Sequence, residues 1–388
     1  MVNHPPVRRY LLTASLVTLA ATGIAAVPAQ ADPGGWIVAA DSPDAIHGEY
    51  LVAFEDGLAD ATATVDAFGG DVESVFGSVD TVLAQMTESE AERLAADPAV
   101  AWVEQNQTVE IQATQDDPPS WGLDRIDQSA LPLSGSYTYP NAGEGVTAYI
   151  IDTGIWASTA DFSGRTGTGY SAILPGLQGL DCNGHGTHVA GTVGGTSYGV
   201  AKEATIVPVQ VLNCLGSGTT AGVIQGVNWV TENAVKPAVA NMSLGGGVSD
   251  ALDAAIKASI DSGVTYAVAA GNETADACGV SPARTPEAIT VAASTEADAR
   301  ADFSNYGACV DLFAPGENIT SPYLLGQPSA LSGTSMASPH VAGAAAVYLS
   351  AHPDATPAEV ADALTGAAVS GAVSDVQGSP NLLLQVTD

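Results

Sequence analysis

Basic residues are scarce in this sequence. It contains 10 lysines and arginines against 43 aspartates and glutamates, which gives a formal net charge of −33 at pH 7. Such a balance repels nucleic acids and anionic membrane surfaces, so we expect neither as a partner. Most of the carboxylates are expected to form a solvated surface, although acidic surfaces also hold Ca²⁺.

Charged residues of both signs together make up only 14% of the chain, whereas hydrophobic residues make up 46%. This composition excludes wholesale disorder. A chain of 388 residues can bury a sizeable core and is long enough for more than one folding unit. The sequence shows no repeat of solenoid period.

The apolar run near the N-terminus is short for a membrane span. It covers residues 10–26, follows Arg8 and Arg9, and precedes the small-x-small sequence Ala29-Gln30-Ala31. This pattern is typical of a cleaved secretory signal over residues 1–31 rather than of a membrane anchor. We therefore expect a secreted, extracellular protein that is free of the membrane once the signal has been removed.

Cysteines are few, and all four follow residue 180. They lack the paired C-x₂-C spacing typical of zinc sites, and export favours disulfides over metal thiolates. Four cysteines allow three pairings, and the residues alone do not choose among them. The four are Cys182, Cys214, Cys278 and Cys309.

The segment around Ser335 has the pattern of a loop that runs into a helix. Small residues lead into Ser335, and an alanine-rich apolar run follows over residues 341–349. The free N–H groups of a helix's first turn can face a developing negative charge, which suits a serine nucleophile that has a base nearby. The same pattern is typical of a serine N-cap on a core helix, so this segment alone does not decide whether Ser335 is a nucleophile or a helix cap.

Two further segments supply a histidine and an aspartate that could act with Ser335. Residues 146–151 predict a strand that ends at Asp152, and His185 lies between glycines at the expected start of a helix. Aspartate, histidine and serine follow one another in the chain order of the subtilisin triad. The segments Asp152-Thr153-Gly154, His185-Gly186-Thr187-His188 and Gly333-Thr334-Ser335-Met336-Ala337 resemble the three motifs of the subtilisin-like serine peptidases. The resemblance runs from about Trp121 to the C-terminus and is closest to the proteinase K and aqualysin branch.

The resemblance implies a role for each of these residues. Ser335 would attack the scissile carbonyl, His185 would take its proton, and Asp152 would hold the imidazole. His188 shares a helix face with His185 and is expected to be a packed structural residue. Asn272 would donate to the oxyanion together with the Ser335 backbone N–H, although an Asn in a Gly-Asn turn is the common alternative.

The resemblance also implies the surfaces that bind substrate. An extended peptide would lie between the segment beginning at Ser243 and an opposite edge strand around residues 215–218, pairing with both as an added strand. Backbone pairing tolerates many sequences, so we expect broad specificity. We also expect a preference for aromatic or large apolar side chains before the cut bond, and the absence of an acidic residue over 243–247 argues against a furin-like preference for basic ones. The expected binding residues are Gly216, Ser217, Gly218, Ser243, Leu244, Gly245, Gly246, Ala269 and Gly271.

Disulfides and Ca²⁺ are implied in the same way. The aqualysin-like pairing is Cys182 with Cys214 and Cys278 with Cys309. A Ca²⁺ site would use the carbonyls of Pro286 and Ala288 and the carboxylate of Asp311, with capping carboxylates in turns as the alternative. Part of a second calcium loop is expected at Asp124, Asp127 and Gln128, where Ser134 and Ser136 replace the Asp and Asn of relatives.

Residues 32–112 predict a small unit of their own. Strands are expected over residues 48–54, 72–76, 81–86 and 99–103, with helices over 60–68 and 89–95. This is a ferredoxin-like order. The unit resembles the inhibitory propeptide of subtilisin-like enzymes, which implies a folding aid for a slowly formed parallel sheet and an intramolecular inhibitor. An accessory domain that stays attached is the alternative.

The remaining chain predicts an α/β domain with a mostly parallel sheet, because apolar strand-like runs alternate with helical ones. Sites in such sheets lie at the carboxyl ends of strands, where Asp152, Gly245 and Asn272 are expected. The resemblance implies a subtilisin-like three-layer fold. A self-cleavage after Gln112 would divide the precursor into a signal (1–31), a propeptide (32–112) and a peptidase domain (113–388).

We therefore expect a secreted, monomeric serine endopeptidase that acts on proteins and peptides and has no catalytic metal or organic cofactor. A lipase is one rival, but it would need the sequence Gly-x-Ser-x-Gly around its nucleophile. A catalytically dead binding protein on the same fold is the other. Such a protein usually lacks a triad member, whereas all of them are present here.

Overall fold

The chain forms two compact units, Met1–Val109 and Glu110–Asp388. The computed structural model describes residues 35–386 except 41, 43–44, 56, 108–112, 175 and 177. The predicted signal and the bond after Gln112 lie outside the described residues. No helix within the described ranges combines the length and the apolar character needed to cross a membrane.

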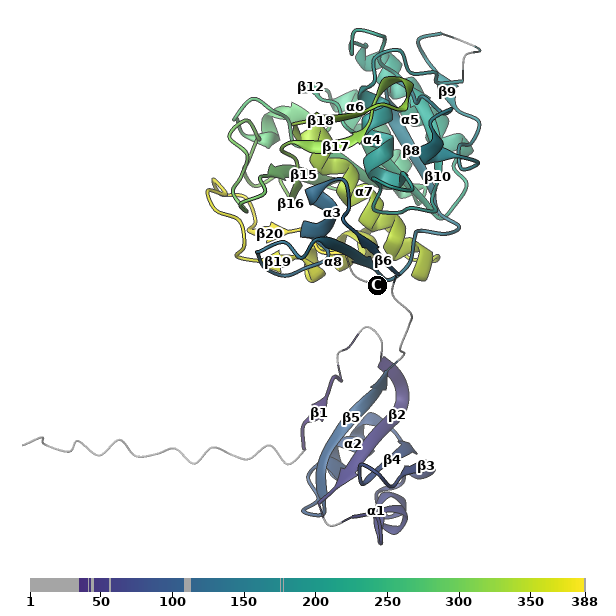
Figure 1. Cartoon of the computed structure of the whole chain (residues 1–388), viewed down its shortest axis with the longest axis vertical. Coiled ribbons are helices and arrows are strands. Elements are labelled where there is room, and N and C mark those ends of the chain that lie inside the picture. The colour runs from purple at the N-terminus through teal and green to yellow at the C-terminus, as the bar shows by residue number, and fades with distance from the viewer. Residues whose placement is uncertain are drawn as a thin grey trace, which may run out of the picture. The chain divides into compact units, whose positions relative to one another are not determined.

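The smaller unit packs two helices against a five-stranded sheet (Figure 1). Side chains alternate between the two faces of β2, so that Tyr50, Val52 and Phe54 share the core with Val65 of α1 and Leu94 of α2. The predicted order of strands and helices is present, and a short parallel strand, β1, is added beside β5. The sheet order is β1-β5-β2-β4-β3. The elements are β1 (Ile37–Val38), β2 (Ala45–Phe54), α1 (Ala61–Phe68), β3 (Asp71–Phe76), β4 (Thr81–Gln85), α2 (Glu88–Ala95) and β5 (Val100–Gln107).

The larger unit is built on a nine-stranded sheet in the order β19-β20-β16-β15-β13-β11-β8-β10-β9. Its strand pairs are parallel apart from β19 with β20. This is the mostly parallel α/β sheet that the sequence predicts. The strands are β8 (Thr147–Asp152), β9 (Tyr170–Ser171), β10 (Thr205–Gln210), β11 (Ala238–Met242), β13 (Thr265–Ala269), β15 (Ile289–Ser294), β16 (Leu312–Pro315), β19 (Val369–Ser370) and β20 (Leu382–Leu383).

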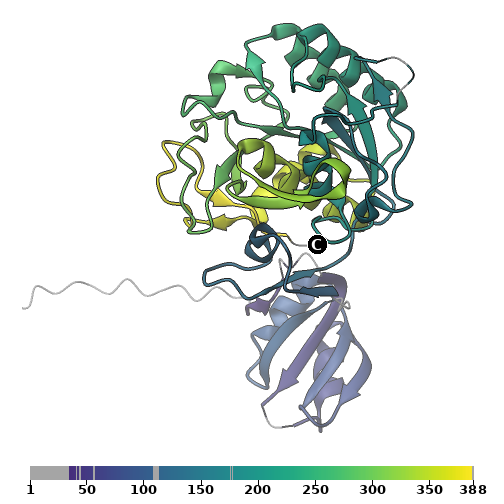
Figure 2. The same cartoon turned by 45° about the horizontal axis from the view of Figure 1, so that its top comes forward.

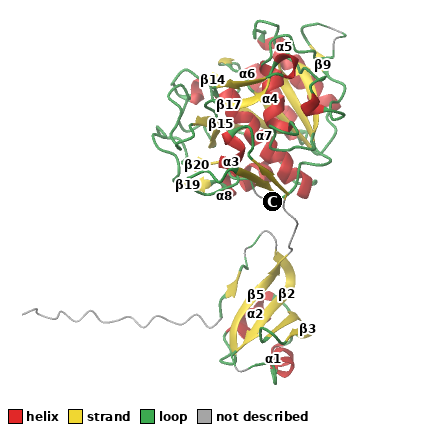
Figure 3. Cartoon of the chain, in the orientation of Figure 1, coloured by secondary structure: helices red, strands yellow, loops and turns green. Residues whose placement is uncertain are grey.

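Helices cover both faces of this sheet, which makes three layers (Figure 3). Successive residues of β8 point to opposite faces, so Ile150 belongs to the core on the side of α4, α7 and α8, while Ile151 belongs to the core on the side of α5 and α6. The helices are α3 (Trp121–Ile126), α4 (His185–Gly194), α5 (Thr220–Asn233), α6 (Asp250–Asp261), α7 (Thr334–Ala351) and α8 (Pro357–Ala367). Helix α7 passes through the middle of the unit (Figure 2) and is buried over most of its length.

Short paired segments border the sheet. They are β6 (Ala113–Asp116) with β7 (Ser136–Tyr139), β12 (Gly246–Gly247) with β14 (Val280–Ser281), and β17 (Ile319–Pro322) with β18 (Pro328–Leu331). Within the described residues, the larger unit also contains three 3₁₀ turns: η1 (Ala160–Phe162), η2 (Ala277–Gly279) and η3 (Leu324–Gly326).

The order of the strands decides which residues lie together at the carboxyl edge of the sheet. Strand β11 lies between β8 and β13, with Asn241 opposite both Ile150 and Ala267. Because these three strands are parallel, the residues that follow them leave the sheet at the same edge. That edge therefore receives Asp152 from β8 and Asn272 from the turn after β13.

A buried ion pair ties the first helix of the unit to the loop after β15. The Arg125 side chain is fully buried, and it donates to the two carboxylate oxygens of Asp298 at 2.8 and 3.1 Å. Asp298 has a φ of 55°, a conformation that Asp and Asn tolerate better than most residues.

We predict that Asp298→Asn lowers the free energy of unfolding by about 3 kcal/mol, because it leaves the charge of Arg125 buried without a counter-ion while keeping a side chain suited to this φ. The measurement is denaturant unfolding. Asp261→Asn, which breaks the exposed 3.3 Å pair with Lys257, is the control and should cost less than about 1 kcal/mol. Equal losses in the two variants would contradict the prediction.

Candidate active site

Asp152 and His185 are in direct contact at the carboxyl edge of the sheet. Asp152 ends β8 and is fully buried, and its Oδ1 lies 2.7 Å from Nδ1 of His185, the first residue of α4. The same oxygen accepts the Thr153 N–H at 2.7 Å, while Oδ2 is buried without a hydrogen-bond partner. A carboxylate beside Nδ1 keeps the proton there, so Nε2 retains the lone pair that a base requires.

The electrostatics of His185 favour its charged form. Burial alone would lower the pKa of His185, but the charge and hydrogen bond of Asp152, helped by the charge of Asp181, outweigh burial and raise the pKa above its usual value. The ring therefore gains a proton more readily than a free histidine does.

A buried carboxylate builds the loop that positions His185. Asp181 is 1% exposed, and its two oxygens accept the backbone N–H groups of Asn183, Gly184 and Thr187 at 2.8 to 3.1 Å. The hydroxyls of Thr153 and Thr187 donate to it as well, at 3.0 and 2.5 Å. A negative charge at the start of α4 is also stabilised by the free N–H groups there. The sequence pattern assigned no role to Asp181, although it lies only four residues before His185.

Gly184, which precedes His185, has a φ of 108°. A side chain at this position would be strained, and its Cβ would also lie 2.4 Å from the ring of Tyr323. Only glycine therefore allows the chain to turn into α4 at this point.

His188 and His340 do not share this environment. Both are buried, and burial lowers the pKa of each to about 4, so both are neutral near pH 7. Nε2 of His188 faces the carbonyls of Ile319 and Ser329 at 2.9 and 3.0 Å, which makes this nitrogen the donor. The structure thus places His188 in the core.

Ser335 lies in the first turn of α7, on the same rim. Its hydroxyl donates to the carbonyl of Ser243 at 3.2 Å. Two adjoining hollows border this rim and share the residues 244–247: one of about 480 Å³ is lined by His185, and one of about 380 Å³ by Asn272 and Ser335.

The structure fixes which end of the Asn272 amide is free to donate. Its Oδ1 accepts both the backbone N–H and the hydroxyl of Thr334, at 2.8 and 3.0 Å. The hydroxyl of Thr334 accepts the Gly271 N–H at 3.1 Å in turn. The NH₂ group of Asn272 is therefore the end that can donate into the hollow beside Ser335. Sequence reasoning missed Thr334, although it immediately precedes the serine.

The buried amide of Asn305 holds the turn that carries Asn272. Asn305 is fully buried; its oxygen accepts the N–H groups of Glu273 and Ala275, and its NH₂ donates to Ala270 and Glu273. Gly271 has a φ of 104°, and a Cβ there would lie 2.2 Å from the Asn305 amide. The role of Asn305 has no sequence signal, because it lies 33 residues beyond Asn272.

The predicted substrate-binding residues line the two hollows. Gly216, Ser217, Gly218 and Ser243 border the larger hollow, Ala269 and Gly271 border the smaller one, and residues 244–246 border both. A Cβ built at Gly246 or Gly247 meets no atom within 4 Å, so a peptide could approach this backbone closely. Glu273, which the sequence analysis did not consider, also lines the smaller hollow.

The segment 215–218, expected as an edge strand, is not a strand in the structure: residues 214–215 form a turn, residue 216 a bend, and residues 217–218 are irregular. The Asn213 side chain accepts the N–H groups of Leu215 and Ser217, which closes the turn. The disulfide Cys182–Cys214 (S–S 2.03 Å) ties this turn to the loop before His185. A second disulfide joins Cys278 and Cys309, so the pairing is the one that the family resemblance implies.

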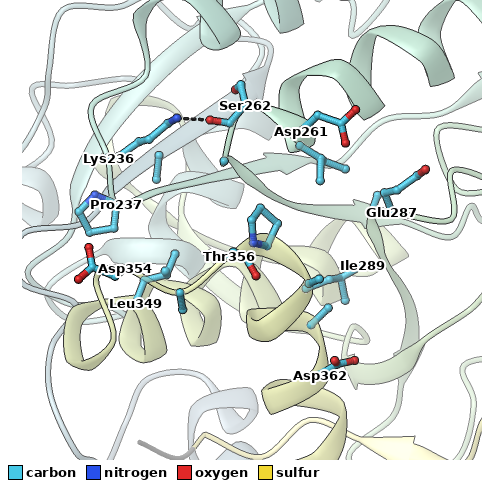
Figure 4. Close-up of a pocket in the computed structure, with 18 of the residues that line it drawn as sticks. Lys236, Pro237, Asp261, Ser262, Glu287, Ile289, Leu349, Asp354, Thr356 and Asp362 are labelled. Carbon is cyan, nitrogen blue, oxygen red and sulfur yellow. Dashed lines mark hydrogen bonds between the residues drawn. The ribbon is translucent and has the colours of Figure 1, made fainter.

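The calcium residues expected from the resemblance fall in two places. Pro286, Ala288 and Asp311 line a hollow of about 860 Å³ at the amino ends of β11 and β15, shown in Figure 4 with Glu287 and Ile289 at its side. Burial raises the pKa of Asp311 to about 6, although its Oδ2 accepts the Thr290 N–H at 2.7 Å. A carboxylate that is poorly solvated in this way fits a cation ligand.

The second group surrounds the loop between α3 and β7. The carboxylate of Asp124 accepts N–H groups of Ser134 and Gly135, and Gln128 bonds to the same loop. Asp127 accepts the Thr138 N–H through Oδ2, while its Oδ1 is buried without a partner and burial raises its pKa. That unpaired oxygen fits a cation, whereas Asp124 already satisfies backbone donors.

Comparison with known proteins gives consistent matches over most of the chain. The profile of the subtilase family matches residues 143–381. An extracellular serine proteinase of Thermus sp. (strain Rt41A) is 50% identical over 385 residues, which cover 92% of this chain and 94% of the relative. The alkaline serine exoprotease A of Vibrio alginolyticus is 45% identical over 89% of this chain and 69% of its own. The crystal structure of a cold-adapted subtilisin-like serine proteinase has a TM-score of 0.68 and 54% identity, over 69% of this chain and 98% of that one.

We predict that Asp181→Asn lowers the pKa of His185, because it removes one of the negative charges that stabilise the imidazolium. It should also lower the free energy of unfolding by about 1–3 kcal/mol, since N–H groups at the start of α4 lose a charged acceptor. An NMR titration of the His185 ring and denaturant unfolding measure the two effects. The exposed Asp116→Asn is the control, and an unchanged His185 pKa in Asp181→Asn would contradict the prediction.

Proposed function

The chain belongs to the subtilase family and is a serine endopeptidase, and we propose that Asp152, His185 and Ser335 are its catalytic triad. A single observation supports this assignment above the others. The buried Asp152 carboxylate holds Nδ1 of His185 at 2.7 Å on the rim that also carries Ser335 and a donor end of Asn272. Like its relative from Thermus, which is named an extracellular proteinase, the protein is secreted.

In the proposed mechanism the hydroxyl of Ser335 attacks the carbonyl carbon of the scissile bond. Nε2 of His185 takes the hydroxyl proton and later gives it to the leaving amine, while Asp152 stabilises the imidazolium. The developing oxyanion accepts hydrogen bonds from the NH₂ of Asn272 and the backbone N–H of Ser335. Thr334 contributes indirectly, because it keeps the Asn272 oxygen turned away from the oxyanion.

The proposed substrate is an extended peptide chain. Residues 243–246 and 216–218 offer backbone groups on either side of it, and Ala269 and Gly271 border the hollow for the side chain before the cut. Leu244, Ala269 and Val280 give that hollow apolar walls. We therefore propose broad specificity with a preference for aromatic or large apolar side chains at this position.

The smaller unit is proposed to be the propeptide of a zymogen. It would aid folding of the peptidase domain and inhibit it until the bond after Gln112 is cut. The described structure of the larger unit starts with β6 at Ala113, the proposed first residue of the mature enzyme, which pairs with Tyr139 of β7. We propose that the mature enzyme is a monomer.

Ca²⁺ is proposed as a structural ion. Pro286, Ala288 and Asp311 would hold one ion through two carbonyls and a carboxylate, and Asp127, with Asp124 and Gln128, would take part in a second site. Bound there, Ca²⁺ would offset the cost of burying these carboxylates and stabilise the fold, without taking part in the chemistry.

The assignment of Ser335 is tested by comparing the wild-type protein with Ser335→Ala. We predict that the wild type cuts casein, loses this activity to a serine-directed phosphonate, and has a mature N-terminus near Ala113. Ser335→Ala should remain an uncut precursor and lose at least about 10⁴-fold in activity.

Each alternative has its own outcome in this experiment. An equally processed Ser335→Ala protein would show that another enzyme makes the cut. Phosphonate-sensitive hydrolysis of lipid esters without proteolysis would indicate a lipase, and no hydrolysis at all would indicate a binding protein on this fold.

Chelation tests the calcium proposal. We predict that removing Ca²⁺ from the mature enzyme lowers its melting temperature, because a ligand at 100 times its Kd adds about 2.7 kcal/mol to the stability of the folded state. Asp311→Asn should melt lower in Ca²⁺ and lose most of its response to the chelator. Glu287→Gln, a neighbour outside the proposed ligand set, is the control. A full chelator response in Asp311→Asn would rule out this site.

A further inference from the structure

Ser335, the proposed nucleophile, lies where one backbone hydrogen bond of α7 is missing. In an α-helix the carbonyl of residue i accepts the N–H of residue i+4. For Ser335 that residue is Pro339, which is buried inside α7 and has no N–H. A proline ring also pushes against the carbonyl four residues before it. The Ser335 carbonyl therefore has no regular partner within α7.

The hydroxyl of Ser243 supplies the missing donor. It donates to the Ser335 carbonyl at 2.7 Å, from the segment that follows β11. The Ser335 hydroxyl donates in the opposite direction, to the Ser243 carbonyl at 3.2 Å. Ser335 and Ser243 thus bind each other twice, each through one hydroxyl and one carbonyl.

Two further buried side chains determine the direction of the Ser243 hydroxyl. The NH₂ group of Asn241 donates to the Ser243 oxygen at 2.9 Å, so the hydroxyl proton must point elsewhere, and the Ser335 carbonyl accepts it. The oxygen of Asn241 accepts the Ser338 hydroxyl at 2.7 Å. The side chains of Ser243, Asn241 and Ser338 are at least 97% buried, so water does not compete well for these bonds.

The four residues make a closed circuit. It starts at the Ser335 carbonyl, passes through Ser243 and Asn241 of the β11 segment, and returns through Ser338 to the first turn of α7. The circuit therefore fixes that turn to the carboxyl end of β11, one strand away from the Asp152 end of β8.

We propose that Ser243, oriented by Asn241 and Ser338, positions the nucleophile by replacing the N–H that Pro339 lacks. The inference rests on the proposed role of Ser335. Ser243 does not touch the reacting atoms through its hydroxyl; it holds the backbone from which the Ser335 hydroxyl and N–H project. A displacement of about 1 Å in such a group can cost about 10²-fold in rate, because attack and oxyanion bonding both depend on its place.

The test is a double-mutant cycle between Ser243→Ala and Pro339→Ala on the full-length protein. The first substitution removes the donor, and the second restores a backbone N–H that can reach the Ser335 carbonyl. We expect Ser243→Ala to lower kcat for a peptide amide substrate about 10- to 100-fold with little change in KM, because the Ser243 backbone that faces the peptide remains. We expect the double variant to recover most of the lost kcat.

Ser338→Ala gives a second measurement that does not rely on the proline. It should lower kcat less than Ser243→Ala does, and it should add little when combined with Ser243→Ala, since it acts through the same hydroxyl. The rate at which a serine-directed phosphonate inactivates each variant should follow kcat, because that reaction also begins with attack by the Ser335 hydroxyl. Active-site titration corrects for incomplete maturation.

Ser259→Ala is the matched control. Ser259 is a fully buried serine of α6 that accepts the Tyr266 hydroxyl at 2.9 Å, so its loss should change stability and leave kcat unchanged. Additive losses in the Ser243 and Pro339 variants, or a Ser243→Ala protein that loses stability but keeps kcat and the phosphonate rate, would overturn the proposal. An active Ser335→Ala protein would instead refute the proposed nucleophile itself, which separates the two failures.

Discussion

A carboxylate without access to water stands at the centre of this structure. Asp152 is fully buried at the end of a strand, and a buried charge is costly unless groups of opposite polarity surround it. The Thr153 N–H and the His185 ring provide that environment, and the ring in return gains a higher pKa. The same contact therefore stabilises the end of β8, fixes the imidazole and prepares it to accept a proton.

The remaining parts of the site are held by buried polar groups rather than by the hydrophobic core. Asp181 shapes the start of α4, Asn305 holds the turn that carries Asn272, and Thr334 orients the amide of Asn272. Each of these groups has several partners, so each fixes a backbone conformation that an apolar side chain could not specify. Glycines with positive φ at positions 184 and 271 permit the two sharp turns that result.

The acidic composition has two different physical meanings in this chain. Many of the 43 acidic residues are solvent-exposed, and these carry the charge that repels other anions. A few are buried and hold backbone groups in place, namely Asp152 and Asp181 in the site and Asp124 in α3. Asp311, beside the hollow of Figure 4, is partly buried. Only burial separates the two groups, and composition does not reveal it.

The sequence by itself determined the family, the α/β fold with its mostly parallel sheet, and the residues of the proposed triad, because local motifs of fixed spacing carry these features. The disulfide pairing followed only from resemblance, since four cysteines allow three pairings. The tertiary structure decided which groups support the residues of the proposed site from elsewhere in the chain. Asn305, Ser243 and Ser338 lie 33, 92 and 3 residues from the site residues they support, and no periodicity marks them. It also decided that segment 215–218 begins in a turn rather than a strand, because the Asn213 side chain accepts the N–H groups of Leu215 and Ser217.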